Sequence, residues 1–326
     1  MDLAIAVHEY GGPEQLRAER AAAAAPGRAE VLLRQTAVGV NFIDVYHRTG
    51  LYPLPQLPHG IGSEAVGVVE AIGPGVTGLS VGDRVGYAIG GAPGAYAVRR
   101  VVPAWRLVPL PRGIDDVTAA GLLLKGLTAE MLVRRVHRVG PRQRVLVHAA
   151  AGGVGLLLCQ WLRHLGAYVI GTVSTDAKAE VAGAHGCHLP IVTTRDDFPA
   201  VVRGATKGKG VDVVYDSVGR TTFSGSLQCL RPRGLLVSFG NASGPPAPLA
   251  PAELARHGSL FLTRPSLGDY TRTVQELRRA AAALFTVVQQ GAVVPPAPRQ
   301  LPLAQAAEAH RLLESRATTG PLVLVP

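Results

Sequence analysis

Cysteine is scarce in this sequence, with three residues in 326, and these lie far apart at Cys159, Cys187 and Cys229. Such spacing offers neither a disulfide framework nor the paired cysteines of a structural zinc lobe. Long apolar runs are also missing, since none approaches the roughly 20 residues of a membrane span, and the N-terminus lacks the pattern of a signal peptide. We therefore expect a cytoplasmic protein in which Cys159 packs in a core.

Acidic residues are outnumbered, at 23 against 33 Lys and Arg, and the net charge is +10. A basic surface can bind nucleic acid, but here the basic residues are scattered without a dense run. The charge therefore favours an arginine-rich surface that attracts an anionic cofactor. With 47% hydrophobic and 17% charged residues, the chain is long enough for two domains with cores of their own.

The most informative stretch runs from Arg144 to Gly166. It holds a short apolar run, then Gly152, Gly153 and Gly155, then apolar residues at helical spacing, as in a strand, a turn and a helix. Glycines permit a tight turn, and the free N–H groups and the dipole of the following helix attract an anion. This pattern predicts a dinucleotide pyrophosphate at the turn; a glycine-rich loop without a ligand is the alternative.

The end of the next apolar run indicates which nucleotide is bound. The run stops at Ser174, nineteen residues after Gly155, where an NAD site usually carries Asp or Glu for the ribose 2′-hydroxyl. Here Ser174 and Thr175 are followed by Lys178. Hydroxyls and a cation suit a 2′-phosphate, so the sequence favours NADPH over NADH.

The chain changes character along its length. Short strands and glycine turns without helical crossovers suggest an all-β barrel for the first ~120 residues. From about Asp116 the pattern becomes β-α-β, which predicts an α/β fold with a doubly wound parallel sheet beside the β-rich domain. Leu322–Val325 is a last strand that we expect to rejoin the first domain. For Ala21–Ala25 a short helix and a surface loop both remain open.

Several longer motifs follow in a fixed order: Gly39-Val-Asn-Phe-Ile-Asp-Val-Tyr46, Leu124-Lys-Gly-Leu-Thr128, His148-Ala-Ala-Ala-Gly-Gly-Val-Gly155, Val214-Tyr-Asp-Ser-Val-Gly-Arg220, Val237-Ser-Phe-Gly-Asn241, Thr263-Arg-Pro-Ser-Leu267 and Leu313-Glu-Ser-Arg-Ala317. Together they make nearly the whole chain resemble the medium-chain dehydrogenase/reductase superfamily, and within it the zeta-crystallin-like NADPH:quinone oxidoreductases. The resemblance implies a GroES-like catalytic barrel domain in residues 1–122 and a Rossmann NADPH-binding domain in residues 123–265. It also implies that residues 266–326 return to the catalytic domain, that the nicotinamide lies in the cleft between the domains, and that the protein is a homodimer. The exposed strand run Ser259–Thr263 could pair across the two-fold axis.

The resemblance assigns roles to residues by their position. Asn41 and Tyr46 would line the nicotinamide and substrate cleft. Cofactor contacts would come from Thr128, Ser217, Phe239 and Asn241, from Gly153 and Val154 at the pyrophosphate within the turn Gly152–Gly155, and from Ser174, Lys178 and Arg316 at the 2′-phosphate. Thr194 stands where the family tends to have a tyrosine near the adenine and its phosphate. A stacking or phosphate contact is therefore expected to be missing, which would weaken NADPH affinity without reversing the preference for NADPH.

Plainer interpretations remain for several of these residues. Asn41 could serve only to cap the helix that follows it. Tyr46 and Tyr52 could be ordinary half-buried aromatics, and Lys178 a solvated helix residue.

Zinc alcohol dehydrogenases of the same superfamily use a catalytic cysteine, a Gly-His-Glu sequence and a second cysteine. Here no cysteine precedes Cys159, Gly62-Ser63-Glu64 stands in place of Gly-His-Glu, and His59 is flanked by proline and glycine. We therefore expect no zinc.

Without a metal or a Ser-His-Asp set, the chemistry is expected to belong to the cofactor. We expect hydride transfer from NADPH to a quinone, with the proton taken from water or from a hydroxyl such as Tyr46 or Tyr52. An NADPH-dependent enone or alkenal reductase is the first alternative. A crystallin-like or RNA-binding protein that keeps the nucleotide site is the second.

Overall fold

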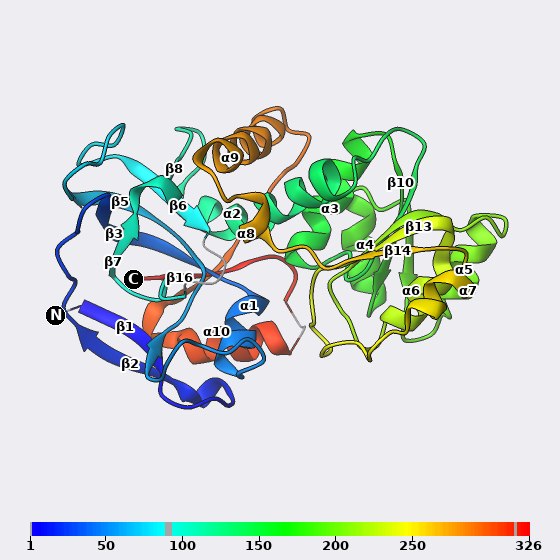
Figure 1. Cartoon of the computed structure of the whole chain (residues 1–326), viewed down its shortest axis with the longest axis horizontal. Helices are drawn as coiled ribbons and strands as arrows, with labels where there is room; N and C mark the ends of the chain where they lie inside the picture. The colour runs from blue at the N-terminus through cyan, green and yellow to red at the C-terminus, as the bar shows by residue number, and fades with distance from the viewer. Residues whose placement is uncertain (1, 89–92, 316–317) are drawn as a thin grey trace. The chain divides into compact units, whose positions relative to one another are not determined.

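A computed structural model describes residues 2–88, 93–315 and 318–326 (Figure 1). The chain forms two compact units. The first consists of Met1–Leu127, Thr271–Phe285 and Pro295–Pro326, and the second of Thr128–Tyr270 and Thr286–Val294. Among the described residues, none of the helices is both long and apolar enough to span a membrane.

The first unit is built on β-sheets. Its 7-stranded sheet has the order β15-β16-β3-β5-β6-β8, and β7 also pairs with β3. These strands are β3 (Glu30–Val40), β5 (Glu64–Ile72), β6 (Arg84–Ala88), β7 (Arg99–Pro103), β8 (Val108–Pro109), β15 (Arg299–Pro302) and β16 (Leu322–Val325). A 3-stranded sheet has the order β2 (Leu16–Ala21), β1 (Asp2–Val7) and β4 (His59–Gly60). Helices α1 (Phe42–Arg48) and α10 (Ala306–Glu314) complete the unit. So do the residues through Leu127 of α2 (Asp116–Met131) and those through Phe285 of α9 (Val274–Gln289).

Strand β3 organises this unit because its side chains alternate between the core and the other face. Val31, Leu33 and Val38 are fully buried in one apolar cluster with residues from both ends of the chain. The last strand, β16, pairs antiparallel with β3 (Leu324 opposite Val38), and in Figure 1 its red arrow lies among the blue and cyan strands. The last strand of the chain thus belongs to the sheet that β3 organises.

The second unit is a 6-stranded parallel sheet in the order β11-β10-β9-β12-β13-β14. The strands are β9 (Arg144–Val147), β10 (Tyr168–Val173), β11 (Leu189–Val192), β12 (Val211–Asp216), β13 (Leu230–Ser238) and β14 (Phe261–Thr263). The helices are α3 (Gly153–His164), α4 (Asp176–Ala184), α5 (Phe198–Ala205), α6 (Phe223–Cys229), α7 (Pro251–Arg256) and α8 (Leu267–Tyr270). Because the chain runs outward from β9 to β11 and then crosses to β12, the strand order reverses between β9 and β12. Open parallel sheets bind ligands at such a point, outside the carboxyl ends of the strands.

Local patterns predicted most of these elements. Cys159 is fully buried in α3 as expected, and all three cysteines are free and buried. Strand β2 ends at Ala21 and residues 22–27 have no regular structure, so the loop alternative is correct for that segment. Strand β2 itself was not predicted, because its charged residues Arg17, Glu19 and Arg20 are typical of a surface loop.

Candidate functional site

The glycine turn joins β9 to α3. Gly152 is the N-cap in an extended conformation, and Ala149 has a positive φ of 51°. A Cβ on Gly155 would lie 2.2 Å from the Ala149 carbonyl oxygen, so only glycine lets the helix pack directly on the turn. Helix geometry leaves the first-turn N–H groups of Gly153, Val154 and Gly155 without intrahelical acceptors. These groups and the helix dipole fit a pyrophosphate.

A buried polar network supports the turn from below. His148 directly follows β9, and its ring nitrogens lie 2.8 Å from Thr172 Oγ1 and 2.9 Å from Ser226 Oγ. Burial lowers the pKa of His148, which keeps the ring neutral. Asp216 accepts a hydrogen bond from Thr222 Oγ1 (2.9 Å) and from the amides that follow Ser217. Hydrogen bonds thus connect the ends of β9, β10 and β12.

Three predicted residues of the 2′-phosphate end come together after β10 and β11. Lys178 Nζ donates to Ser174 Oγ (3.4 Å), and Thr194 Oγ1 donates to the Ser174 carbonyl oxygen (3.3 Å). The neighbouring Asp176 accepts from Arg195 Nη1 (2.7 Å), so this carboxylate already has a cationic partner. A hydroxyl and an ammonium group side by side fit a phosphate ester.

Ser217 and Asn241 also lie side by side, after β12 and β13. A Cβ on Gly240 would come within 2.4 Å of the Ser217 carbonyl oxygen, so the two segments touch. The Asn241 amide, oriented to satisfy both of its ends, donates to the Gly240 carbonyl (2.8 Å) and accepts from Arg264 (3.2 Å). Phe239 begins the same segment, and its N–H donates to the Asp216 carbonyl oxygen (2.8 Å).

Two further predicted cofactor residues are Thr128 and Arg316. Thr128 is half-buried on α2. Arg316 lies outside the described residues. Their roles remain predictions.

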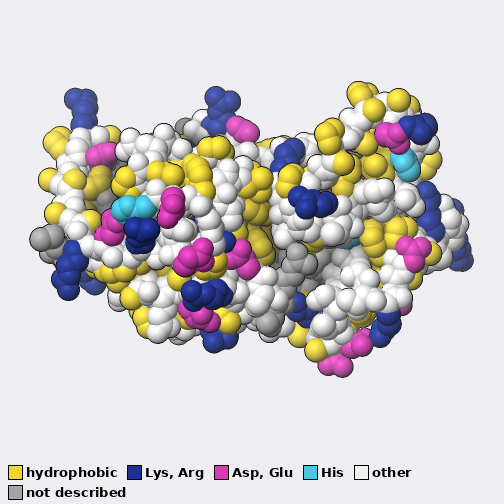
Figure 2. Space-filling model, turned by 90° about the horizontal axis from the view of Figure 1, so that it is seen from below, with side chains coloured by type: hydrophobic (Ala, Val, Ile, Leu, Met, Phe, Trp, Pro, Cys, Tyr) yellow, Lys and Arg dark blue, Asp and Glu magenta, His cyan; other side chains and the backbone are white. Residues whose placement is uncertain are grey.

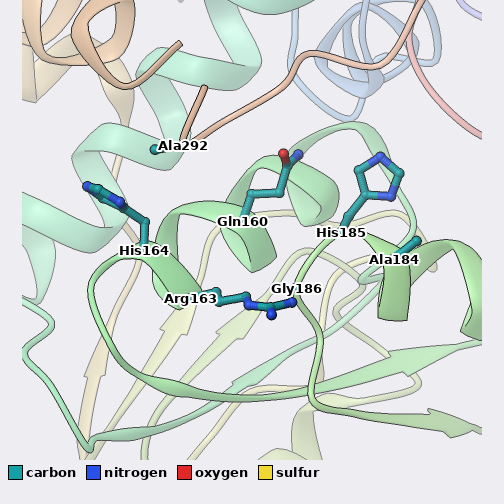
Figure 3. A pocket seen from close by; sticks show the side chains of 7 residues that line it. All are labelled: Gln160, Arg163, His164, Ala184, His185, Gly186 and Ala292. Carbon is teal, nitrogen blue, oxygen red and sulfur yellow. The ribbon is translucent and has the colours of Figure 1, made fainter. Parts of the chain in front are cut away.

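A separate cavity of about 370 Å³ opens in the second unit (Figure 3). It is lined by Gln160, Arg163, His164, Ala184, His185, Gly186 and Ala292. They come from the last half of α3, from the end of α4 and the two residues after it, and from the segment after α9, whereas the glycine turn is at the start of α3. None of the predicted cofactor residues lines this cavity.

The three predicted catalytic residues belong to the first unit, on α1 and the segment after it. Asn41 is the N-cap of α1 and only 7% exposed. Tyr46 is buried on the same helix, and its ring meets that of half-buried Tyr52 edge-on at 5.1 Å between centroids. The Tyr52 N–H also donates to the Tyr46 carbonyl oxygen (3.0 Å). The structure therefore pairs the two tyrosines and places Asn41 five residues before Tyr46, at the start of the same helix.

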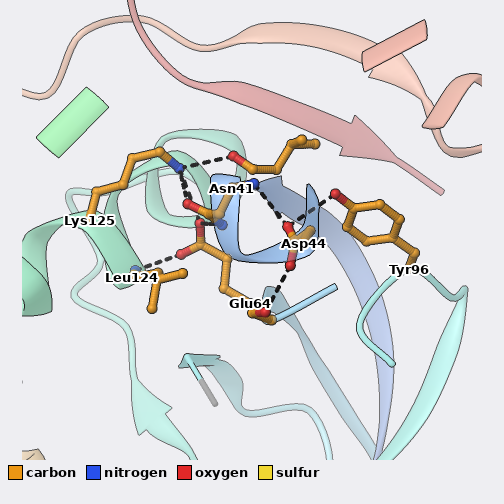
Figure 4. Close-up of polar contacts among 8 residues, drawn as sticks. Asn41, Asp44, Glu64, Tyr96, Leu124 and Lys125 are labelled. Atoms are coloured by element: carbon orange, nitrogen blue, oxygen red, sulfur yellow. Dashed lines mark hydrogen bonds and ion pairs between the residues drawn. The ribbon is translucent and has the colours of Figure 1, made fainter. Parts of the chain in front are cut away.

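The Asn41 side chain is held by two residues that sequence reasoning missed (Figure 4). Its Nδ2 donates to Glu64 Oε1 (2.8 Å), and its Oδ1 accepts from Lys125 Nζ (2.7 Å). Lys125 lies on α2 with 8% of its surface exposed. One signal was available: a lysine next to Leu124 and Leu127 in an apolar helix is unusual, because lysine is rarely buried without a partner.

A second buried carboxyl group, Asp44, lies beside this cluster. Its oxygens accept from Ser63 Oγ (2.7 Å), the Asn41 N–H (2.9 Å) and Tyr96 Oη (3.1 Å). Burial nevertheless raises the pKa of Asp44 to about 7. The charge of Glu64 contributes to this rise.

The donor set in this region does not fit a catalytic zinc. Ser63, at the position of the histidine in Gly-His-Glu, gives its hydroxyl to Asp44, and His59 Nδ1 contacts the Gly60 carbonyl (2.7 Å). All three thiols belong to the second unit. Among the residues that the structure describes, no three His, Cys, Asp or Glu side chains are grouped to hold a metal ion.

Two protein-family models match the chain. The model described as zinc-binding dehydrogenase matches residues 153–284, and the alcohol dehydrogenase GroES-like domain matches residues 27–112. A quinone oxidoreductase of Pseudomonas aeruginosa is 48% identical over 317 residues, which are 97% of this chain and 97% of that protein. A 2-haloacrylate reductase of a Burkholderia species is 46% identical over an alignment of 332 residues, which covers 100% of this chain and 99% of that protein.

The solved structure of Escherichia coli quinone oxidoreductase complexed with NADPH superposes with a TM-score of 0.97 at 44% identity, covering 99% of this chain and 100% of that one. These matches confirm the predicted fold class, a GroES-like domain with a Rossmann-type parallel sheet. They also confirm the resemblance inferred from the motifs. The chain belongs to the quinone oxidoreductase family of the medium-chain dehydrogenase/reductase superfamily.

Proposed function

We propose that this protein is a zinc-independent NADPH:quinone oxidoreductase. One observation carries the proposal: the parallel-sheet unit contains both a tight glycine turn, which suits a pyrophosphate, and the hydrogen-bonded pair Ser174 and Lys178, which suits a 2′-phosphate. The relatives named quinone oxidoreductase support it, as does the E. coli structure with NADPH. We propose that the enzyme works without zinc because the first unit offers no cysteine thiol as a zinc ligand.

Different residues would bind different parts of NADPH. The amides of Gly153 and Val154 would hold the pyrophosphate, and Ser174 with Lys178 the 2′-phosphate. When bound, NADPH supplies a hydride from its C4, which reduces a quinone to the hydroquinone anion and leaves NADP⁺. A proton from water, or from Tyr46 or Tyr52, then completes the hydroquinone. The protein's part is to bind, to orient and to exclude water.

A conjugated double-bond reductase is the second candidate. It is favoured by the 2-haloacrylate reductase that covers the whole chain at 46% identity. The same hydride would add to the β-carbon of an unsaturated acid or enone, and negative charge would again develop toward a carbonyl or carboxylate oxygen. An RNA-binding role has weaker support, because the basic side chains on the face drawn in Figure 2 are scattered among acidic and apolar ones.

NADPH oxidation at 340 nm tests the proposal. The purified protein is mixed with NADPH or NADH, with 1,4-benzoquinone or 9,10-phenanthrenequinone, and with or without EDTA. We expect rapid quinone-dependent loss of NADPH, much slower loss of NADH and no effect of EDTA. Parallel assays with 2-chloroacrylate and an enone separate the two candidates. If the protein reduces 2-chloroacrylate or the enone but no quinone, the double-bond reductase replaces the quinone oxidoreductase as the proposed function. Inhibition by EDTA would contradict the proposal that the enzyme needs no zinc.

We also propose a homodimer formed through β14. This strand is last in the sheet order, and Phe261 and Leu262 are 60% and 39% exposed. An exposed apolar edge strand is a surface for pairing with a second copy. Light scattering should give a dimer for the natural chain and a monomer for Phe261→Asp; an unchanged mass would refute this surface. The three free thiols and the use of NADPH support a cytoplasmic location.

A further inference from the structure

The buried ammonium group of Lys125 has all of its donors engaged. Nζ donates to Asn41 Oδ1 (2.7 Å), to the Val40 carbonyl oxygen (3.3 Å) and to Glu64 Oε1 (3.3 Å). An ammonium group has three N–H donors, and three acceptors surround this one. Lys125 is therefore built to act on its protein neighbours and not on a ligand directly.

Glu64 is fixed as firmly on the other side of the amide. It is fully buried on β5, and its Oε2 accepts from the Leu124 N–H (2.6 Å) while Oε1 accepts from Asn41 Nδ2. A Cβ on Gly39 would lie 2.2 Å from Glu64 Oε1, so the neighbouring strand leaves the carboxylate no room to move. The backbone of β3, β5 and α2 therefore holds the Glu64 carboxylate in one position.

This arrangement dictates the orientation of the Asn41 amide. A cation faces its oxygen and a carboxylate faces one of its N–H groups. Rotation by 180° would put N–H groups against an ammonium and an oxygen against a carboxylate, replacing two attractions by two repulsions. An amide has two N–H donors, so one is left to donate elsewhere. The ammonium also polarises the amide and makes that N–H a stronger donor.

We propose that Lys125 and Glu64 are positioning residues of the reductase. They orient Asn41 so that its second N–H donates to the acceptor oxygen on which negative charge develops as hydride arrives. A preorganised donor at such an oxygen stabilises the transition state more than the bound substrate. This inference rests on the proposed function, and it adds two buried residues that do not touch the substrate themselves.

A double-mutant cycle between Asn41 and Lys125 tests the inference. The variants are Asn41→Ala, Lys125→Met, their combination, and Lys125→Arg, with exposed Lys209→Met as the matched control. Loss of one oxyanion donor costs about 10²–10³ in kcat, which sets the scale for Asn41→Ala. We expect Lys125→Met to lower kcat by about tenfold or more with little change in the KM for NADPH, Lys125→Arg to retain more activity, and Lys209→Met to match the natural chain.

The combination decides between positioning and a merely structural role. If Lys125 acts through Asn41, the double variant is no slower than Asn41→Ala alone, within about twofold. Losses that multiply would overturn the inference, and so would a Lys125→Met variant with unchanged kcat. If circular dichroism shows that Lys125→Met does not fold, the cycle is repeated with Glu64→Gln and with Lys125→Arg, each combined with Asn41→Ala. A natural chain that turns over no acceptor refutes the proposed function itself, which separates that failure from failure of the cycle.

Discussion

The buried carboxyl group of Asp44 should make stability fall as pH rises. Burial raises its pKa from 3.8 to about 7, despite hydrogen bonds from Ser63, Asn41 and Tyr96 that act in the opposite direction. Between these two values the folded chain binds one more proton than the unfolded chain, so the free energy of unfolding decreases with rising pH. One pKa unit corresponds to 1.36 kcal/mol, and a rise of about three units is therefore worth roughly 4 kcal/mol.

Replacing Asp44 by Asn removes this titration. The difference in unfolding free energy, Asp44→Asn minus the natural residue, should increase by about 2.5 kcal/mol from pH 4.5 to pH 6.5 and level off above pH 7. A constant offset from lost hydrogen bonds does not affect this trend. Urea unfolding can be followed by Trp105 fluorescence in a Trp161→Phe background, so that the signal reports on the first unit.

Val81→Ala is the control, because this side chain is 66% exposed and the change removes no titratable group. Its difference from the natural chain should not vary with pH. If the Asp44→Asn difference is equally flat, or if it shrinks as pH rises, Asp44 is ionised in the folded protein throughout this range and the reasoning is refuted.

Three further outcomes are expected. Burial, with the charge of Arg48, lowers the pKa of His310 to about 3, so the folded protein loses stability as pH falls from 6.5. The unfolding free energy of His310→Gln should therefore rise relative to that of the natural chain as pH falls, whereas that of Asp44→Asn rises as pH increases. A flat difference in the same urea series would contradict this. Lys178→Ala should raise the KM for NADPH about tenfold and leave that for NADH unchanged, and equal effects on both would remove Lys178 from the 2′-phosphate site. Gly155→Ala should abolish NADPH binding measured by nucleotide fluorescence, whereas Gly183→Ala, a helical position with nothing within 4 Å of the added Cβ, should not; normal binding by Gly155→Ala would contradict the close approach at the turn.

Local patterns were enough to predict the elements of the proposed nucleotide-binding edge. The strand, the glycine turn and the helix from Arg144 to Gly166 are adjacent in the chain, and Ser174 and Lys178 lie within one helical turn of each other. Geometry over so few residues follows from spacing alone. The contact of Thr194 with Ser174 was less accessible, because it depends on how β10 and β11 pair.

The cluster around Asn41 could not be predicted in this way. Lys125 is 84 residues from Asn41 in the chain, and Glu64 is 23 residues away. Only the packing of α2 against two strands brings the three together. The sequence did show that Gly62-Ser63-Glu64 lacks the histidine of a zinc site, but it gave no partner for the glutamate that remains.

The same short helix, α1, is held at its start, its middle and its end by separate polar contacts. Asn41 is bound by Glu64 and Lys125, Asp44 by Ser63 and Tyr96, and Arg48 by a bidentate pair with Glu314 (both 2.8 Å). Buried ion pairs add little net stability, because desolvation offsets the attraction. An apolar core would hold a seven-residue helix as well, so the gain from these contacts is orientation. They aim the Asn41 amide. Replacing both partners of one buried pair by apolar residues of similar volume leaves no unpaired charge, so we expect such a double change to reduce turnover far more than it reduces the melting temperature.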